Sequence, residues 1–319
     1  MPAATFARAL QGDRRSLARS ISLIEARAEG VHEAVAALPI RRAGGPGAPH
    51  VIGLTGPPGA GKSTFTRGLV QCARDLGRRV AVVAVDPSSP FSGGAILGDR
   101  IRMEPKQADP GVFVRSVASR GHLGGLSRAT GQVVDLLDAV GFDLMVIETV
   151  GVGQSELSVM EVADTVLVLL TPESGDTVQT MKAGLLEVAD GFVVNKADRP
   201  GAARLQRALE QMVSLDAELH GREAGWLAPV STSCATEGEG LQRVYDMAVD
   251  HLEWCQGAGL PTWHERRARG RIRTFLDLVS EEARHRAEKE LVQEDPSLLD
   301  ELKSGRINPY LAASRWILR

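Results

Sequence analysis

The stretch Gly56-Pro57-Pro58-Gly59-Ala60-Gly61-Lys62-Ser63 decides the fold of this 319-residue chain. It fits the pattern G-x-x-x-x-G-K-S, the P-loop, whose glycines let backbone N–H groups surround the phosphates of a nucleotide. An apolar run before it, residues 51–55, predicts a strand, and residues 64–76 after it have the apolar periodicity of a helix. A phosphate-binding loop needs this context, because the N-terminus of the helix attracts anions.

The P-loop gives a first set of candidate ligands. Lys62 supplies a positive charge to the phosphates, and the hydroxyl of Ser63 is placed to bind Mg²⁺. The residues expected to bind nucleotide here are Gly56, Pro57, Gly59, Ala60, Gly61, Lys62, Ser63 and Thr64.

A second motif, Asn195-Lys196-Ala197-Asp198, follows the apolar run 191–194. The pattern N-K-x-D after a strand is typical of the loop that reads guanine. The carboxylate of Asp198 can accept hydrogen bonds from both the ring N–H and the exocyclic amine of guanine, and adenine offers no such pair of donors. Because an unpaired polar group in a binding site costs affinity, Asn195, Lys196 and Asp198 predict GTP and GDP as the bound nucleotides.

Three acids are candidates for the metal site. Asp86 ends an apolar run, Asp99 lies in the glycine-rich segment 92–100, and Glu148 ends the run 143–147. Mg²⁺ takes about six oxygen ligands and usually keeps waters, so some of these acids act through water or in only one state. We expect Ser63, Asp86, Asp99 and Glu148 to be the metal ligands, and Lys62 with the three acids to carry catalysis.

A further segment is Gly175-Asp176-Thr177-Val178-Gln179-Thr180-Met181-Lys182-Ala183-Gly184. Its spacing alone leaves two interpretations open: an ordinary loop that enters a helix, or a switch that responds to the nucleotide. The segment contains Asp176, Gln179 and Lys182, and we expect it near Gly151, which follows Glu148 in the string Glu-Thr-Val-Gly.

The chain predicts an α/β fold with a mostly parallel, twisted sheet and helices on both faces. Runs that are apolar throughout, as in a sheet buried on both faces, occupy residues 50–55, 79–85, 112–117, 142–148, 164–170, 190–195 and 227–231. Residues 4–38 predict helical structure, and the chain after Pro261 is helical, with an apolar stripe from Ile272 to Ala287. We therefore expect an N-terminal helical extension and linker (1–49), a GTPase domain (50–259) and a C-terminal helical dimerisation arm (260–319).

The composition argues against several classes of protein: nucleic-acid-binding, membrane-spanning and disulfide-rich. A net charge of −3 gives no reason to expect a nucleic-acid partner, and no apolar stretch approaches the length of a membrane span. The 3 cysteines are scattered and form no disulfide framework, which predicts a cytoplasmic protein.

Beyond these motifs the sequence resembles the MeaB/ArgK/MMAA family of SIMIBI-class P-loop GTPases. The resemblance spans nearly the whole chain and rests on residues 56–63, 86–89, 93–103, 148–156, 179–182, 195–198 and 308–313. The family's guanine loop corresponds to residues 231–235, where Ser233, Cys234 and Ala235 are candidates and the contacting residue is left open.

The resemblance implies a GTPase chaperone of an adenosylcobalamin-dependent acyl-CoA mutase, chiefly methylmalonyl-CoA mutase. Such a protein gates cobalamin loading and protects the mutase from inactivation. The resemblance further implies Mg²⁺ ligation, the switch function of the 175–184 segment, a homodimer through the C-terminal helices and an indirect link to the cobalamin adenosyltransferase.

Three other functions are weighed against this one. A metallocentre-assembly GTPase of the same superfamily typically carries Cys-rich or His-rich sites, whereas the 3 Cys and 7 His of this chain form no cluster in sequence. An ATP-dependent kinase conflicts with the N-K-x-D motif. An intact P-loop also argues against a scaffold that hydrolyses nothing.

Overall fold

The computed structural model describes residues 2–41, 47–86, 109–118, 128–149, 162–174, 189–220, 225–257 and 262–317. The chain forms two compact units, Met1–Gly270 and Arg271–Arg319. The sequence-based division at residues 49 and 259 stays a prediction.

A seven-stranded sheet lies at the centre of the described part of the first unit. Its strands are β1 (His50–Thr55), β2 (Val80–Asp86), β3 (Val112–Ala118), β4 (Leu144–Thr149), β5 (Thr165–Leu170), β6 (Gly191–Asn195) and β7 (Val230–Ser233). Their order is β3-β2-β4-β1-β5-β6-β7, and every pairing is parallel. The parallel α/β fold is thus confirmed, and all seven expected strands are present. Since the strands are parallel, the loops after them all leave from one edge.

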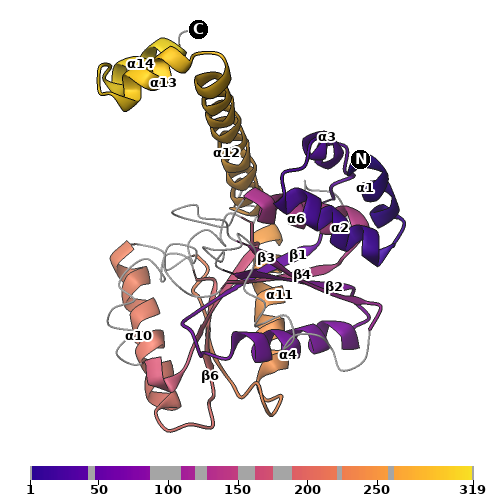
Figure 1. Cartoon of the computed structure of the whole chain (residues 1–319). Helices are drawn as coiled ribbons and strands as arrows, with labels where there is room; N and C mark the ends of the chain where they lie inside the picture. The colour runs from indigo at the N-terminus through magenta and orange to yellow at the C-terminus, as the bar shows by residue number, and fades with distance from the viewer. Residues whose placement is uncertain are drawn as a thin grey trace. The chain divides into compact units, whose positions relative to one another are not determined.

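Helices cover both faces of this sheet (Figure 1). On one face, α4 (Lys62–Asp75) and α11 (Leu241–Gly257) pack on alternate residues such as Ile52 and Leu54. The opposite face carries α6 (Arg128–Val140) over β1 to β4, and α10 (Ala202–His220) over β5 to β7. Burial on both sides explains why the strand sequences are apolar throughout.

The N-terminal region is helical, as expected, and is divided into three helices: α1 (Pro2–Leu10), α2 (Arg14–Glu25) and α3 (Val31–Ala36). Gly12, with a positive φ of 90°, follows the end of α1, and Gly30, with a positive φ of 77°, is the N-cap residue of α3. Asp13 then caps α2 by accepting hydrogen bonds from the N–H groups of Arg15 and Ser16.

These three helices are part of the main core. Phe6, Ile21 and Val31 are buried in the same apolar cluster as α6 and the strands. Arg41 donates to the fully buried carboxylate of Asp138 at 2.9 Å, which fastens the end of the region to α6. Figure 1 shows α1 to α3 in indigo beside α6.

The second unit is helical. It contains the larger part of α12 (Thr262–Gln293), followed by α13 (Pro296–Lys303) and α14 (Pro309–Ile317). Trp316 on α14 donates its indole N–H to Glu290 at 2.6 Å and so holds α14 against α12. The expected apolar stripe of α12 is exposed in this single chain: Ile272, Phe275, Leu276 and Val279 are each at least half accessible. Among the helices of the described ranges, none is long and apolar enough to cross a membrane.

Candidate nucleotide-binding site

The P-loop connects β1, in the middle of the sheet, to the first turn of α4. Three of its residues have positive φ: Gly56 at 144°, Gly59 at 79° and Gly61 at 87°. A Cβ on Gly56 would lie 2.1 Å from the carbonyl oxygen of Leu169 on β5, so the loop needs glycine there to run this close to the neighbouring strand. The loop is therefore packed against β5 as well as being an extension of β1.

Lys62 is the first residue of α4 and is buried. Its ammonium group donates to the carbonyl oxygens of Gly56 at 2.7 Å and Pro57 at 3.0 Å, which keeps the charge within the loop. The first-turn N–H groups of a helix have no partner within the helix and attract anions. This arrangement suits phosphate binding, in which phosphate oxygens take over as acceptors for the ammonium.

Glu148 lies on β4 and is buried beside the start of α4. Ser63 donates its hydroxyl hydrogen to Oε1 of Glu148 at 2.8 Å, and Thr66 donates to Oε2 at 3.0 Å. The structure thus brings together two of the predicted metal ligands. Hydroxyl and carboxylate oxygens are the hard donors that Mg²⁺ prefers, so this pair fits a magnesium site.

Sequence reasoning missed Thr66. Residues three apart lie on the same face of a helix, so a hydroxyl three residues after Ser63 was the available signal. Thr66 and Ser63 together fix both oxygens of Glu148, and this fixes the direction in which the carboxylate points.

The other metal candidates are placed only in part. Asp86 is the last residue of β2, and the β2–β4 register pairs Ala84 with Glu148, so Asp86 lies two residues further toward the carboxyl edge. The side chain of Asp86 and the whole of Asp99 lie outside the described residues, as do the switch candidates Gly151, Asp176, Gln179 and Lys182.

The second motif meets the P-loop through Asn195, the buried last residue of β6. Its amide nitrogen donates to the carbonyl oxygen of Ala60 at 2.8 Å. Its side-chain oxygen accepts from the hydroxyl of Ser233 at 3.1 Å and from the N–H of Ala235 at 3.2 Å. One side chain therefore joins the phosphate loop, the N-K-x-D loop and the loop after β7.

Asp198 is exposed at the end of the N-K-x-D turn. The turn passes through Lys196, whose φ of 56° is in the left-handed region, and the N–H of Ala197 donates to the carbonyl oxygen of Ser233. The thiol of Cys234 donates to Oδ1 of Asp198 at 3.3 Å. The candidates from the two loops thus form one cluster, in which Ser233 and Ala235 hold Asn195 while Cys234 contacts Asp198.

Comparison with known proteins decides the family. A family model described as "Methylmalonyl Co-A mutase-associated GTPase MeaB" matches residues 17–291. The chain belongs to the MeaB family. As a GTPase of this family, it binds GTP and GDP and hydrolyses GTP with water to GDP and phosphate.

Individual relatives agree with the MeaB assignment. A protein named "Probable GTPase" from Mycobacterium tuberculosis H37Rv is 39% identical over 306 residues, which cover 95% of this chain and 90% of the relative. GTPase ArgK of Escherichia coli K12 is 38% identical over 254 residues, 78% of this chain and 75% of that protein. A solved structure named LAO/AO transport system kinase superposes with a TM-score of 0.69 at 26% identity, covering 99% of this chain and 96% of that one. It is a SIMIBI-class P-loop GTPase, so the class expected from the sequence is confirmed.

The assignment of guanine recognition to Asp198 is testable by one substitution. Asp198→Asn removes the acceptor pair for guanine, so GDP binding should weaken by about 1–3 kcal/mol. Xanthine carries an oxygen in place of the exocyclic amine, so the asparagine amide can donate to it and xanthosine diphosphate should bind better to the variant than to the parent chain. Isothermal titration calorimetry measures both ligands. Asp250→Asn, an exposed position on α11, is the control; unchanged GDP affinity in Asp198→Asn contradicts the assignment.

Proposed function

We propose that residues 56–64 bind the phosphates and that Asn195, Lys196 and Asp198, with Ser233, Cys234 and Ala235 behind them, bind guanine. The support is their convergence at the carboxyl edge of the sheet, where Asn195 joins the loops. Lys62 then neutralises charge on the phosphates as the bond to the γ-phosphate breaks, a stage at which a fixed positive charge lowers the barrier.

In this proposal Ser63, Asp86, Asp99 and Glu148 hold Mg²⁺, directly or through water. When bound, the ion neutralises the charge that develops on the phosphate oxygens. The support is the contact between Ser63 and Glu148 and the position of Asp86 on the strand next to Glu148. Thr66 keeps Glu148 oriented toward Ser63 through its own hydrogen bond.

We further propose that GTP hydrolysis serves an adenosylcobalamin-dependent acyl-CoA mutase, with methylmalonyl-CoA mutase as the first partner to test. The chain would gate loading of the cobalamin cofactor and protect the mutase from inactivation, with an indirect link to the cobalamin adenosyltransferase. The observation that carries this proposal is the match to a mutase-associated GTPase family over residues 17–291.

Two other functions make different demands on these residues. A metallocentre-assembly GTPase needs a transfer site for its metal, and in the described ranges no three His, Cys, Asp or Glu side chains are grouped to hold one. An ATP-dependent kinase needs an adenine site, which the acceptor pair of Asp198 disfavours. The mutase chaperone therefore remains the function with the most support.

If residues 175–184 act as a switch, substitutions in them should weaken the response to the mutase without changing the affinity for nucleotide. Gln179→Ala and Lys182→Ala should leave nucleotide affinity within about threefold, roughly 0.7 kcal/mol, because neither residue belongs to the proposed nucleotide ligands. Both should reduce the acceleration of GTP hydrolysis by the mutase and disturb nucleotide-gated cobalamin loading. The measurement is phosphate release with and without purified methylmalonyl-CoA mutase.

Gln211→Ala, an exposed position on α10, is the matched control for that experiment. Full stimulation of GTP hydrolysis by the mutase in both switch variants would mean that residues 175–184 are an ordinary loop. A parent chain that the mutase neither stimulates nor binds would contradict the chaperone proposal itself.

We also propose a homodimer formed through α12. The support is the row of Ile272, Phe275, Leu276 and Val279, which recurs at helical spacing and is exposed in one chain.

Static light scattering tests this homodimer. The full chain should have twice its 34.1 kDa mass, and the double variant Phe275→Glu/Val279→Glu should be monomeric. Arg284→Glu, exposed on the same helix, is the control. A double variant that stays dimeric at low micromolar concentration rules out this face.

A further inference from the structure

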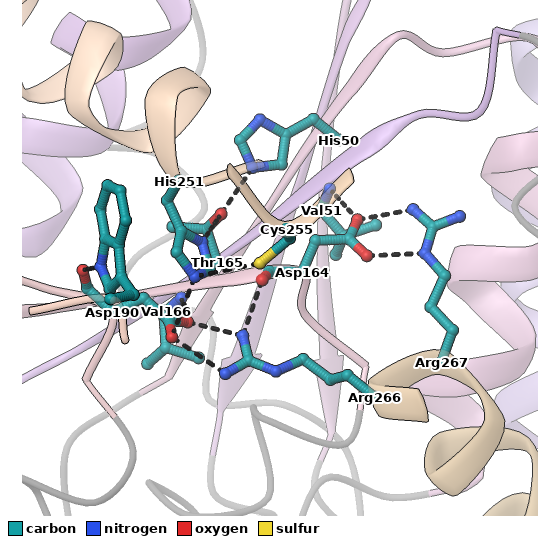
Figure 2. Close-up of polar contacts among 11 residues, drawn as sticks. His50, Val51, Asp164, Thr165, Val166, Asp190, His251, Cys255, Arg266 and Arg267 are labelled. Atoms are coloured by element: carbon teal, nitrogen blue, oxygen red, sulfur yellow. Dashed lines mark hydrogen bonds and ion pairs between the residues drawn. The ribbon is translucent and has the colours of Figure 1, made fainter. Parts of the chain in front are cut away.

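A buried polar network lies at the amino edge of the sheet, opposite the nucleotide site (Figure 2). Its acids are Asp164, directly before β5, and Asp190, directly before β6, and both are buried. Asp164 accepts a hydrogen bond from the N–H of Val51 on β1 at 2.9 Å, and Asp190 accepts one from the N–H of Val166 on β5 at 2.8 Å. Each acid therefore joins the start of its own strand to the neighbouring strand.

Two consecutive arginines of α12 pair with these acids. Arg267, itself buried, donates to both oxygens of Asp164 at 2.7 and 2.8 Å and to the carbonyl oxygen of Pro49 at 3.1 Å. Arg266 donates to both oxygens of Asp190 at 2.7 and 2.9 Å and also to the carbonyl oxygen of Asp164 at 2.7 Å. Both pairs are bidentate, which restricts the relative orientation of the two groups.

The charges in this network are well compensated. Burial alone would raise the pKa of Asp190, but hydrogen bonds from His251 and Arg266 outweigh it and lower the pKa to about 2. Burial also opposes ionisation of Asp164, and the hydrogen bond from Arg267 likewise lowers the pKa of that carboxyl group. Both acids are therefore ionised at neutral pH, and each carries the negative charge that pairs with an arginine.

Histidines connect the same edge to α11. His251 lies 3.3 Å from Asp190 and 2.9 Å from the hydroxyl of Thr165, which in turn lies 2.8 Å from His50 on β1. Burial lowers the pKa of His50 to about 4, so this ring is neutral at physiological pH. The starts of β1, β5 and β6 are thus joined to one another, to α11 and to α12.

The other ends of the same strands carry the nucleotide site. The carbonyl oxygen of Leu169, near the end of β5, lies 2.1 Å from where a Cβ on Gly56 would be. Asn195 ends β6, and its side chain binds the carbonyl oxygen of Ala60. A strand of five or six residues spans about 17–20 Å, and its hydrogen bonds to both neighbours restrain the position of one end relative to the other. Asp164 is therefore joined through β5, and Asp190 through β6, to a residue that contacts the P-loop.

We propose that Arg266 and Arg267 couple nucleotide binding to α12. A nucleotide that holds the P-loop and the N-K-x-D loop together restrains β1, β5 and β6 relative to one another. The two arginines, adjacent on one helix, bridge the starts of those strands and fit only one relative placement of them. This inference rests on the proposed nucleotide site, and it assigns to the first turns of α12 a role in reporting whether that site is filled.

Hydrogen–deuterium exchange of the full chain tests the coupling. Saturating GDP should slow exchange of amides 266–280 by about fivefold or more in the parent chain, the lower end of the range typical of allosteric coupling. In Arg266→Ala this effect of GDP should disappear, and the Kd for GDP should rise by the same factor, because coupling between two sites is reciprocal. Arg266→Lys keeps the charge but loses the bidentate donor geometry of the guanidinium, so it should lose most of the effect of GDP. This variant replaces Arg266→Ala in the test if the alanine variant does not fold.

Arg269→Ala is the matched control, since Arg269 lies on the same helix and its side chain is 81% exposed. A purely structural anchor would raise exchange equally with and without GDP, so the response to GDP is the deciding readout. The proposal is overturned if GDP leaves α12 exchange unchanged in the parent chain, or if both Arg266 variants keep the full response. Failure of the proposed nucleotide site would instead appear as exchange at residues 56–64 and 195–198 that GDP does not change.

Discussion

The side-chain amide of Asn195 is the interaction on which the site depends. Its nitrogen binds Ala60 in the P-loop and its oxygen binds Ser233 and Ala235 after β7. These loops are far apart in sequence and are brought to one edge only because β1, β6 and β7 are parallel. A buried amide whose nitrogen and oxygen are both hydrogen-bonded fixes the spacing of these loops, so the proposed phosphate and base sites keep a constant separation.

At the amino edge of the sheet, buried charged groups are paired with hydrogen-bond donors in a similar way. Asp164 and Asp190 accept strand N–H groups and arginine forks at once, so neither carboxylate is buried without compensation. Removing one partner from a buried pair typically costs about 3–5 kcal/mol, because the remaining charge is left uncompensated. Arg266 and Arg267 belong to the compact unit that ends at Gly270, so the start of α12 is part of the GTPase unit.

Sequence predicted those features that depend on local pattern. All seven strands followed from apolar runs, and the P-loop and N-K-x-D motifs placed Lys62, Ser63 and Asn195 at one edge. The helical N-terminal region was also predicted, but its division into three helices was not, although Gly12 and Asp13 carry the signals of a helix end and a cap. The pairs Arg266–Asp190 and Arg267–Asp164 were not foreseen, because the paired residues lie 76 and 103 residues apart and the helix that carries both arginines was expected to belong to a separate C-terminal arm. Such pairings depend on tertiary placement, which periodicity does not encode.

The central claim is that the Asn195 cluster and the P-loop form one guanine-nucleotide site. Equilibrium displacement of fluorescent GDP from the full chain, with Mg²⁺ present, tests it most directly. Unlabelled GDP and GTP should compete at concentrations about a hundredfold or more below those of ADP and ATP, since adenine leaves the acceptors of Asp198 unpaired. Displacement by adenine nucleotides at the same concentrations as guanine nucleotides would contradict the account.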